Sequence, residues 1–155
     1  MLKSTEAKNH DGGAEMERRR RTEILINGNK NVAATLAQQI LAKYEVKTIE
    51  KPNNGLVMVK VRETAKNSLF YLGEVFVTEC KVEINGYIGI GILKGHEPEL
   101  AYHLAVVDAA YNAQLPETER WNEVLLKEEA AIHEQRKNSF MKILKTKVNF
   151  ETMDV

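Results

Sequence analysis

The chain has 155 residues, of which 43% are hydrophobic and 28% are charged. This composition is that of an ordinary globular protein, long enough to bury a core without disulfides or metal. Because 22 basic residues balance 22 acidic ones, no net field attracts nucleic acid or an acidic membrane. The single cysteine, Cys80, excludes an internal disulfide, and no apolar run approaches the roughly 20 residues of a membrane span. We therefore expect neither nucleic acid nor a membrane as a partner.

The polar residues 1–14 predict a disordered lead that ends after Gly12-Gly13. A single domain is expected over residues 15–155. The start of the chain lacks the apolar core of a signal peptide, which predicts a cytoplasmic protein.

Two short helices are expected first, the second over about 31–44. The first contains the run Arg18–Arg21. Just before this run, Glu15 and Glu17 lie four residues ahead of Arg19 and Arg21, the spacing of ion pairs on one helix face. We interpret this run as a solvated helix face compensated by glutamates. A patch that binds nucleic acid is the weaker alternative, because such a patch should lack the interleaved acids.

The pattern then changes to the alternation of strands. A turn is predicted at 52–55, a bend or bulge at 73–78, and a tight hairpin turn at Asn85-Gly86. The strands are expected over 46–49, 56–62, 69–84 and 87–93.

Helical periodicity returns after Gly95, where Pro98 suits a first helical turn. The small residues of this helix, Ala101, Ala105 and Ala109, predict close packing. A longer helix begins near Glu117, and its polar stretch 133–139 leaves open a solvated helical face or a break. The fold class expected is α+β, an antiparallel meander of about four strands flanked by N-terminal and C-terminal helices.

No catalytic or metal-binding motif stands out. The four histidines lack metal-ligand spacing. Cys80 is interpreted as a buried apolar thiol rather than a nucleophile. Asp108 is interpreted as a buried, hydrogen-bonded carboxylate, with a site acid as the alternative.

A glycine-containing strand and a helix start surround Lys94, Gly95 and His96, the arrangement that binds phosphate at helix N-termini. The glycine spacing does not match the dinucleotide-binding pattern, and Glu97 and Glu99 add negative charge. A tight strand-to-helix turn is therefore the preferred interpretation, and phosphate binding is the alternative.

The last residues carry apolar side chains where a soluble chain normally frays, which predicts docking onto the body or onto a partner. The interface residues expected are Val148, Phe150, Thr152 and Met153.

This tail, KVNFETM, resembles the C-terminal pattern of the PhnG family, approximately Val-Asp-Phe-Phe-Thr-Met. The order of elements over about 16–155 is similar too. It includes a strand with Leu72-Gly73-Glu74-Val75-Phe76-Val77-Thr78, then Gly89, Gly95 and the helix Ala101-x-x-x-Ala105-x-x-Asp108-Ala109. Asn149 and Glu151 depart from the family's acid and aromatic residue, and Arg21 lies near where the family often has tryptophan.

The resemblance implies a subunit of the carbon–phosphorus lyase core complex, which degrades phosphonates in the cytoplasm. In that system PhnG acts with PhnI, PhnH and PhnL to displace adenine from ATP by methylphosphonate, giving ribose 1-methylphosphonate 5-triphosphate. PhnJ carries the radical iron–sulfur step. The resemblance thus implies a transferase subunit without independent activity, with no cofactor of its own and with ATP and methylphosphonate as substrates of the complex.

Two other function classes stay open. One is a stand-alone module that binds a small ligand or phosphate. The other is a small enzyme whose cleft would join His96 or His103 with Asp108. The sequence leaves undecided whether the isolated chain forms a homo-oligomer.

Overall fold

The computed structural model describes residues 16–147, which form four helices and one antiparallel sheet of three strands in the order β1-β2-β3. The predicted α+β class and antiparallel meander are confirmed. The helices are α1 (Arg18–Asn27), α2 (Lys30–Leu41), α3 (Pro98–Asn112) and α4 (Glu117–Lys145). The strands are β1 (Lys47–Arg62), β2 (Leu69–Ile84) and β3 (Tyr87–Lys94).

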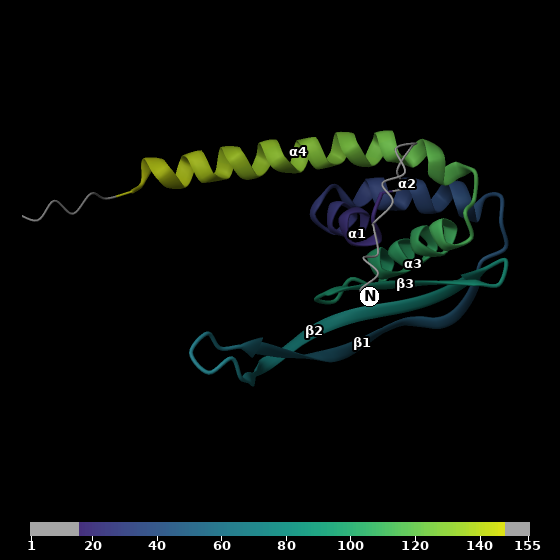
Figure 1. Cartoon of the computed structure of the whole chain (residues 1–155). Helices are drawn as coiled ribbons and strands as arrows, with labels where there is room; N and C mark the ends of the chain where they lie inside the picture. Colours follow the sequence, from purple (N-terminus) through teal and green to yellow (C-terminus); the bar gives the residue numbers. More distant parts are fainter. Residues whose placement is uncertain (1–15, 148–155) are drawn as a thin grey trace, which may run out of the picture.

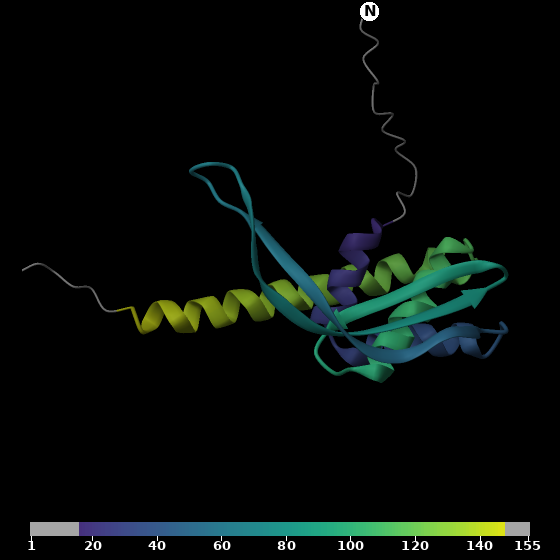
Figure 2. The ribbon, with the colours of Figure 1, turned by 90° about the horizontal axis from the view of Figure 1, so that it is seen from below.

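The elements are stacked in layers on one face of the sheet (Figure 1). Helix α3 packs on β2 and β3, α2 packs on α3, and α4 lies across α1 and α2. Figure 2 views the molecule from below, toward the face of the sheet that no described helix covers. The core therefore lies between the sheet and the helices, and the second face of the sheet is open.

Close packing of α3 on β3 depends on two glycines. A Cβ atom on Gly89 would overlap the backbone of Ala105 and Ala109, and one on Gly91 would overlap the backbone of Ala101. The predicted small-residue row of α3 thus faces the bare side of β3. Both sequence features are needed, because either a side chain on β3 or a larger residue on α3 would separate the two elements.

Strand β1 is continuous where the sequence predicted a turn. The segment 52–55 lies inside β1, with register shifts between Thr48 and Glu50 and between Glu50 and Asn53. Because β1 is an edge strand, Pro52, which has no N–H, can be accommodated beside these irregularities. The two segments 46–49 and 56–62 therefore belong to one strand, and the sheet has three strands rather than about four.

Local turn chemistry is as predicted. Asn85 and Gly86 both have positive φ, 51° and 84°, and join β2 directly to β3. A further register shift in the β1–β2 pair falls next to Gly73, at one end of the predicted bend. Helix α4 runs unbroken to Lys145, so the stretch 133–139 is an exposed helical segment and not a break.

Candidate functional site

Three of the four arginines in the run of α1 form hydrogen bonds with carboxylates of other helices. Arg20 makes a bidentate pair with Glu129 of α4, at 2.9 and 2.6 Å. Arg21 is buried, donates to Asp108 of α3 at 3.2 Å, and lies 4.1 Å from the ring centroid of Tyr111. The interpretation as a solvated, locally compensated face is therefore wrong for Arg21, because its charge is neutralised by a carboxylate 87 residues away.

Asp108 is fully engaged in the structure. It accepts hydrogen bonds from Arg18 at 2.7 Å, from Arg21 at 3.2 Å and from the backbone N–H of Ile90 at 3.0 Å. Asn112, one turn later on α3, donates to the carbonyl of Ile88 at 2.7 Å. Both backbone groups belong to β3, which is an edge strand, so α3 caps polar groups that would otherwise invite another strand.

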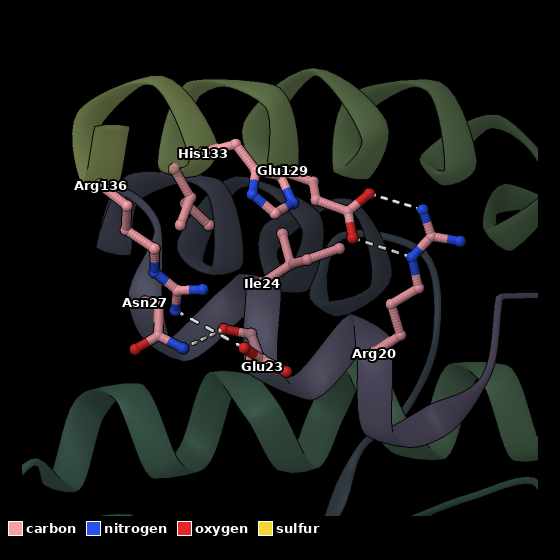
Figure 3. Close-up of a pocket in the computed structure, with 8 residues that line it drawn as sticks. Arg20, Glu23, Ile24, Asn27, Glu129, His133 and Arg136 are labelled. Carbon is pink, nitrogen blue, oxygen red and sulfur yellow. Dashed lines mark hydrogen bonds and ion pairs between the residues drawn. The ribbon is translucent and has the colours of Figure 1, made fainter. Parts of the chain in front are cut away.

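A pocket of about 170 Å³ lies between α1 and α4, as Figure 3 shows. Its two arginines each face a carboxylate, Arg20 with Glu129 and Arg136 with Glu23 at 3.5 Å. The hydrogen bond from Arg20 lowers the pKa of Glu129. Because carboxylates already neutralise the two guanidinium groups, we interpret this pocket as a helix–helix seam and not as an anion site. The lining residues are Arg20, Glu23, Ile24, Asn27, Glu129, Ile132, His133 and Arg136.

The turn with Lys94, Gly95 and His96 joins β3 to α3. Gly95 has φ of 89°, and its N–H donates to the carbonyl of Phe76 at 2.9 Å. The hydroxyl of Thr78 donates to the Gly95 carbonyl at 2.6 Å and accepts from the N–H of Glu97 at 3.0 Å. Two backbone donors that a phosphate would need are thus already used. The phosphate-binding prediction for these three residues stays a prediction.

The residues proposed for a small enzyme are not brought together. Nδ1 of His96 lies 3.0 Å from the side-chain oxygen of Asn54, and neither His96 nor His103 is among the hydrogen-bond or ion-pair partners of Asp108 given above. Cys80 is buried and donates to the carbonyl of Glu50 at 3.3 Å. Burial raises the pKa of the Cys80 thiol, which disfavours the nucleophilic thiolate.

Among residues 16–147, many exposed apolar side chains lie on the long end of the β1–β2 hairpin, residues 56–76, which we call the arm. The arm extends beyond α1, α2 and α3 (Figure 1) and, in the perpendicular view of Figure 2, diverges from α4. Eight of its large apolar side chains are 45–64% exposed: Leu56, Val57, Met58, Leu69, Phe70, Tyr71, Leu72 and Phe76.

The exposed apolar residues of the arm occupy both faces of the ribbon. Leu56 pairs with Phe76, and the next residue, Val57, pairs with Val75 and so points to the opposite face. A two-stranded ribbon is marginally stable in water without cover on an apolar face. Contiguous exposed apolar surface of this extent marks an interaction site. The arm is therefore the strongest candidate for a functional surface.

Three further predictions concern the C-terminal interface residues, metal binding and a membrane span. The predicted interface residues Val148, Phe150, Thr152 and Met153 lie outside the described residues. Between residues 16 and 147, no group of three or more His, Cys, Asp or Glu side chains is placed to hold a metal ion. In the same range, no helix combines the length and apolar content that crossing a membrane requires.

Sequence reasoning missed the arm and the partners of Arg21. The length of the arm had a signal, because the sequence predicts one strand over residues 69–84, 16 residues long against about 5–6 for a typical strand, but its exposure had none. The pairing of Arg21 with Asp108 left no signal, since it depends on how α1 and α3 pack.

In a comparison with protein families, residues 16–154 match the family described as phosphonate metabolism protein PhnG. No curated protein matches the chain. The family match covers nearly the whole chain, and it agrees with the element order on which the sequence resemblance was based. This chain belongs to the PhnG family and takes part in phosphonate metabolism.

Proposed function

We propose that this chain is a non-catalytic subunit of the carbon–phosphorus lyase system. It would act in the cytoplasm with PhnI, PhnH, PhnJ and PhnL type subunits. Its complex would displace adenine from ATP by methylphosphonate, giving ribose 1-methylphosphonate 5-triphosphate, as an α-D-ribose 1-methylphosphonate 5-triphosphate synthase. Family membership and the exposed arm support this proposal.

The arm is the observation that carries the assembly part of the proposal. Burying one large apolar side chain contributes on the order of 1.5–3 kcal/mol, and the arm offers eight that are about half exposed. A stable interface needs roughly 800 Å² from each partner, which a long two-faced ribbon can supply. The arm therefore has the chemistry of a subunit contact rather than of a substrate pocket.

The chain alone should neither hydrolyse ATP nor release adenine from it. The titratable groups that the sequence singled out are held in other contacts, Asp108 by two arginines and Cys80 in the core. No nucleophile with an adjacent general base results among the described residues. ATP and methylphosphonate are proposed as substrates of the assembled complex, with no cofactor held by this chain.

Reconstitution tests the proposal. Adenine release from ATP in the presence of methylphosphonate would be measured with the co-purified PhnI, PhnH and PhnL type subunits, with and without this chain. We expect release only when the chain is added. The double variant Phe70→Ser/Leu72→Ser, altered in the arm, should lose co-purification and adenine release together. Release by the chain alone, or equal release without it, would contradict the proposal.

A phosphate- or small-ligand-binding module is the second candidate, through Lys94, Gly95 and His96. The positive φ of Gly95 and the exposed Lys94 favour it, whereas the occupied N–H groups of Gly95 and Glu97 oppose it. A rise in the melting temperature of the isolated chain with inorganic phosphate, lost in Lys94→Ala, would support this function.

A further inference from the structure

The distal part of α4, after Ile132, projects past the helices on which the earlier part packs. Ile132 is the last buried residue of the helix, and each residue from 133 to 147 is exposed. The helix continues to Lys145, about 20 Å past Ile132 at 1.5 Å per residue. Figure 1 shows this end projecting beyond α1 and α2. Because every side chain of this segment is exposed among residues 16–147, most of its surface is accessible to other molecules.

An apolar stripe runs along this projecting segment. Phe140, Ile143 and Leu144 are 58%, 66% and 44% exposed and follow the i, i+3, i+4 spacing of one helix face. Met141, 51% exposed, lies beside them. An amphipathic helix of this kind normally places its apolar face in a groove.

Basic residues precede and follow the apolar stripe along the chain. Arg136 and Lys137 lie one turn before Phe140, and Lys147 lies one turn after Ile143. Residues 134–147 contain five basic residues and one acidic residue, in a chain whose net charge is zero. Arg136 already pairs with Glu23 of α1 at 3.5 Å, so the charge offered to a partner is assigned to the four exposed lysines of this segment.

The helix macrodipole explains only part of this charge. Lys142 and Lys145 lie in the last turn, where cations stabilise a helix. The macrodipole effect fades within that turn, so it does not account for Lys137 or for the apolar stripe. These features instead match a partner whose apolar groove is edged by carboxylates.

We infer that the distal segment of α4 together with the two residues after it, residues 136–147, docks into an apolar groove edged by carboxylates on a partner protein subunit. This inference rests on the proposed function, because it assumes that the chain works in a complex. A protein groove is favoured over an anionic membrane because the chain as a whole has a net charge of zero, so no net field attracts it to an extended anionic surface. A groove would contact only this basic segment.

The test compares two double variants of the full-length chain. Phe140→Ser/Ile143→Ser alters the stripe, and the matched control, Gln135→Ser/Asn138→Ser, alters the opposite side of the same helix without changing its charge. All four residues are exposed, so both variants should keep the wild-type circular dichroism and melting temperature. Affinity for the co-purified PhnI, PhnH and PhnJ type subunits is then measured.

We expect the stripe variant to raise the Kd by about tenfold or more, and the control by less than about twofold. Raising the ionic strength from about 0.1 M to about 1 M should weaken wild-type binding, because the Debye length falls from about 10 Å to about 3 Å. A photocrosslinker at position 141, but not at 138, should capture a partner peptide near acidic residues.

The outcomes separate this inference from the proposed function. If the wild-type chain assembles and both variants assemble equally well, the docking inference is wrong and the proposed function stands. If the wild-type chain binds none of these subunits, both fail. Flotation with vesicles containing phosphatidylserine tests the membrane alternative. Vesicle binding that the stripe variant loses, together with unchanged subunit binding, would overturn the docking inference in favour of a lipid surface.

Discussion

Asp108 neutralises a buried arginine and at the same time caps the open edge of the sheet. The Arg21 side chain is only 6% exposed, so removing the charge of its partner leaves an uncompensated cation in the core. We predict that Asp108→Asn destabilises the fold by about 3–5 kcal/mol, measured by urea denaturation.

The matched control is Glu129→Gln, which breaks the ion pair with Arg20. That arginine is 51% exposed, so the loss should stay below about 1 kcal/mol. Equal losses in the two variants would show that burial of Arg21 is not what makes Asp108 important.

His103 should make the fold sensitive to mild acid. Burial lowers the pKa of His103 below its ordinary 6.5, and Glu99, which opposes the shift, has the smaller effect. Between the folded and unfolded pKa values the unfolded chain binds more protons, so stability falls as pH decreases through about 6.5 and below. We predict that His103→Gln reduces this fall in the free energy of unfolding between about pH 7.5 and pH 5.5.

At the scale of elements, the contact between β3 and α3 depends on the absence of a side chain. We predict that Gly89→Ala destabilises the fold by about 3 kcal/mol or more, because the added methyl group meets backbone atoms of Ala105 and Ala109, which cannot rotate away. Gly55→Ala is the control. Its methyl group would lie 3.9 Å from Val77 and change stability little. Thermal melts of the two variants check the difference, and a small effect at Gly89 would mean that α3 can shift on the sheet.

The elements that could be predicted from the sequence are those whose conformation depends on residues close together in the chain. Asn85-Gly86 fixes the β2–β3 turn because both residues tolerate positive φ, and the alanine row of α3 predicted its close packing. The turn predicted at 52–55 is wrong. An Asn-Gly pair normally marks a turn, but here Asn54 and Gly55 lie in an edge strand, where β1 can continue through them. The exposure of the arm and of the end of α4 could not be predicted, since burial depends on contacts between distant elements.

At the scale of the whole molecule, folding and assembly involve separate parts of the chain. The core lies between the sheet and the helices, whereas the arm and the distal end of α4 project on the same side of the molecule in both Figure 1 and Figure 2. No residue from 59 to 73 is buried. Removing the end of the arm should therefore leave the core intact while removing an interaction surface.

The arm can be shortened without disturbing strand register. Met58 and Glu74 are directly paired across β1 and β2, so a two-residue Asn-Gly turn can join them in place of residues 59–73. We predict that this variant keeps the melting temperature of the full chain within a few degrees, since the deleted residues contribute no buried side chain, but loses co-purification with the partner subunits. The measurements are thermal unfolding and affinity co-purification. A variant that melts much earlier would show that the arm stabilises the body, and one that still assembles would place the subunit contact elsewhere, with the end of α4 as the next surface to test.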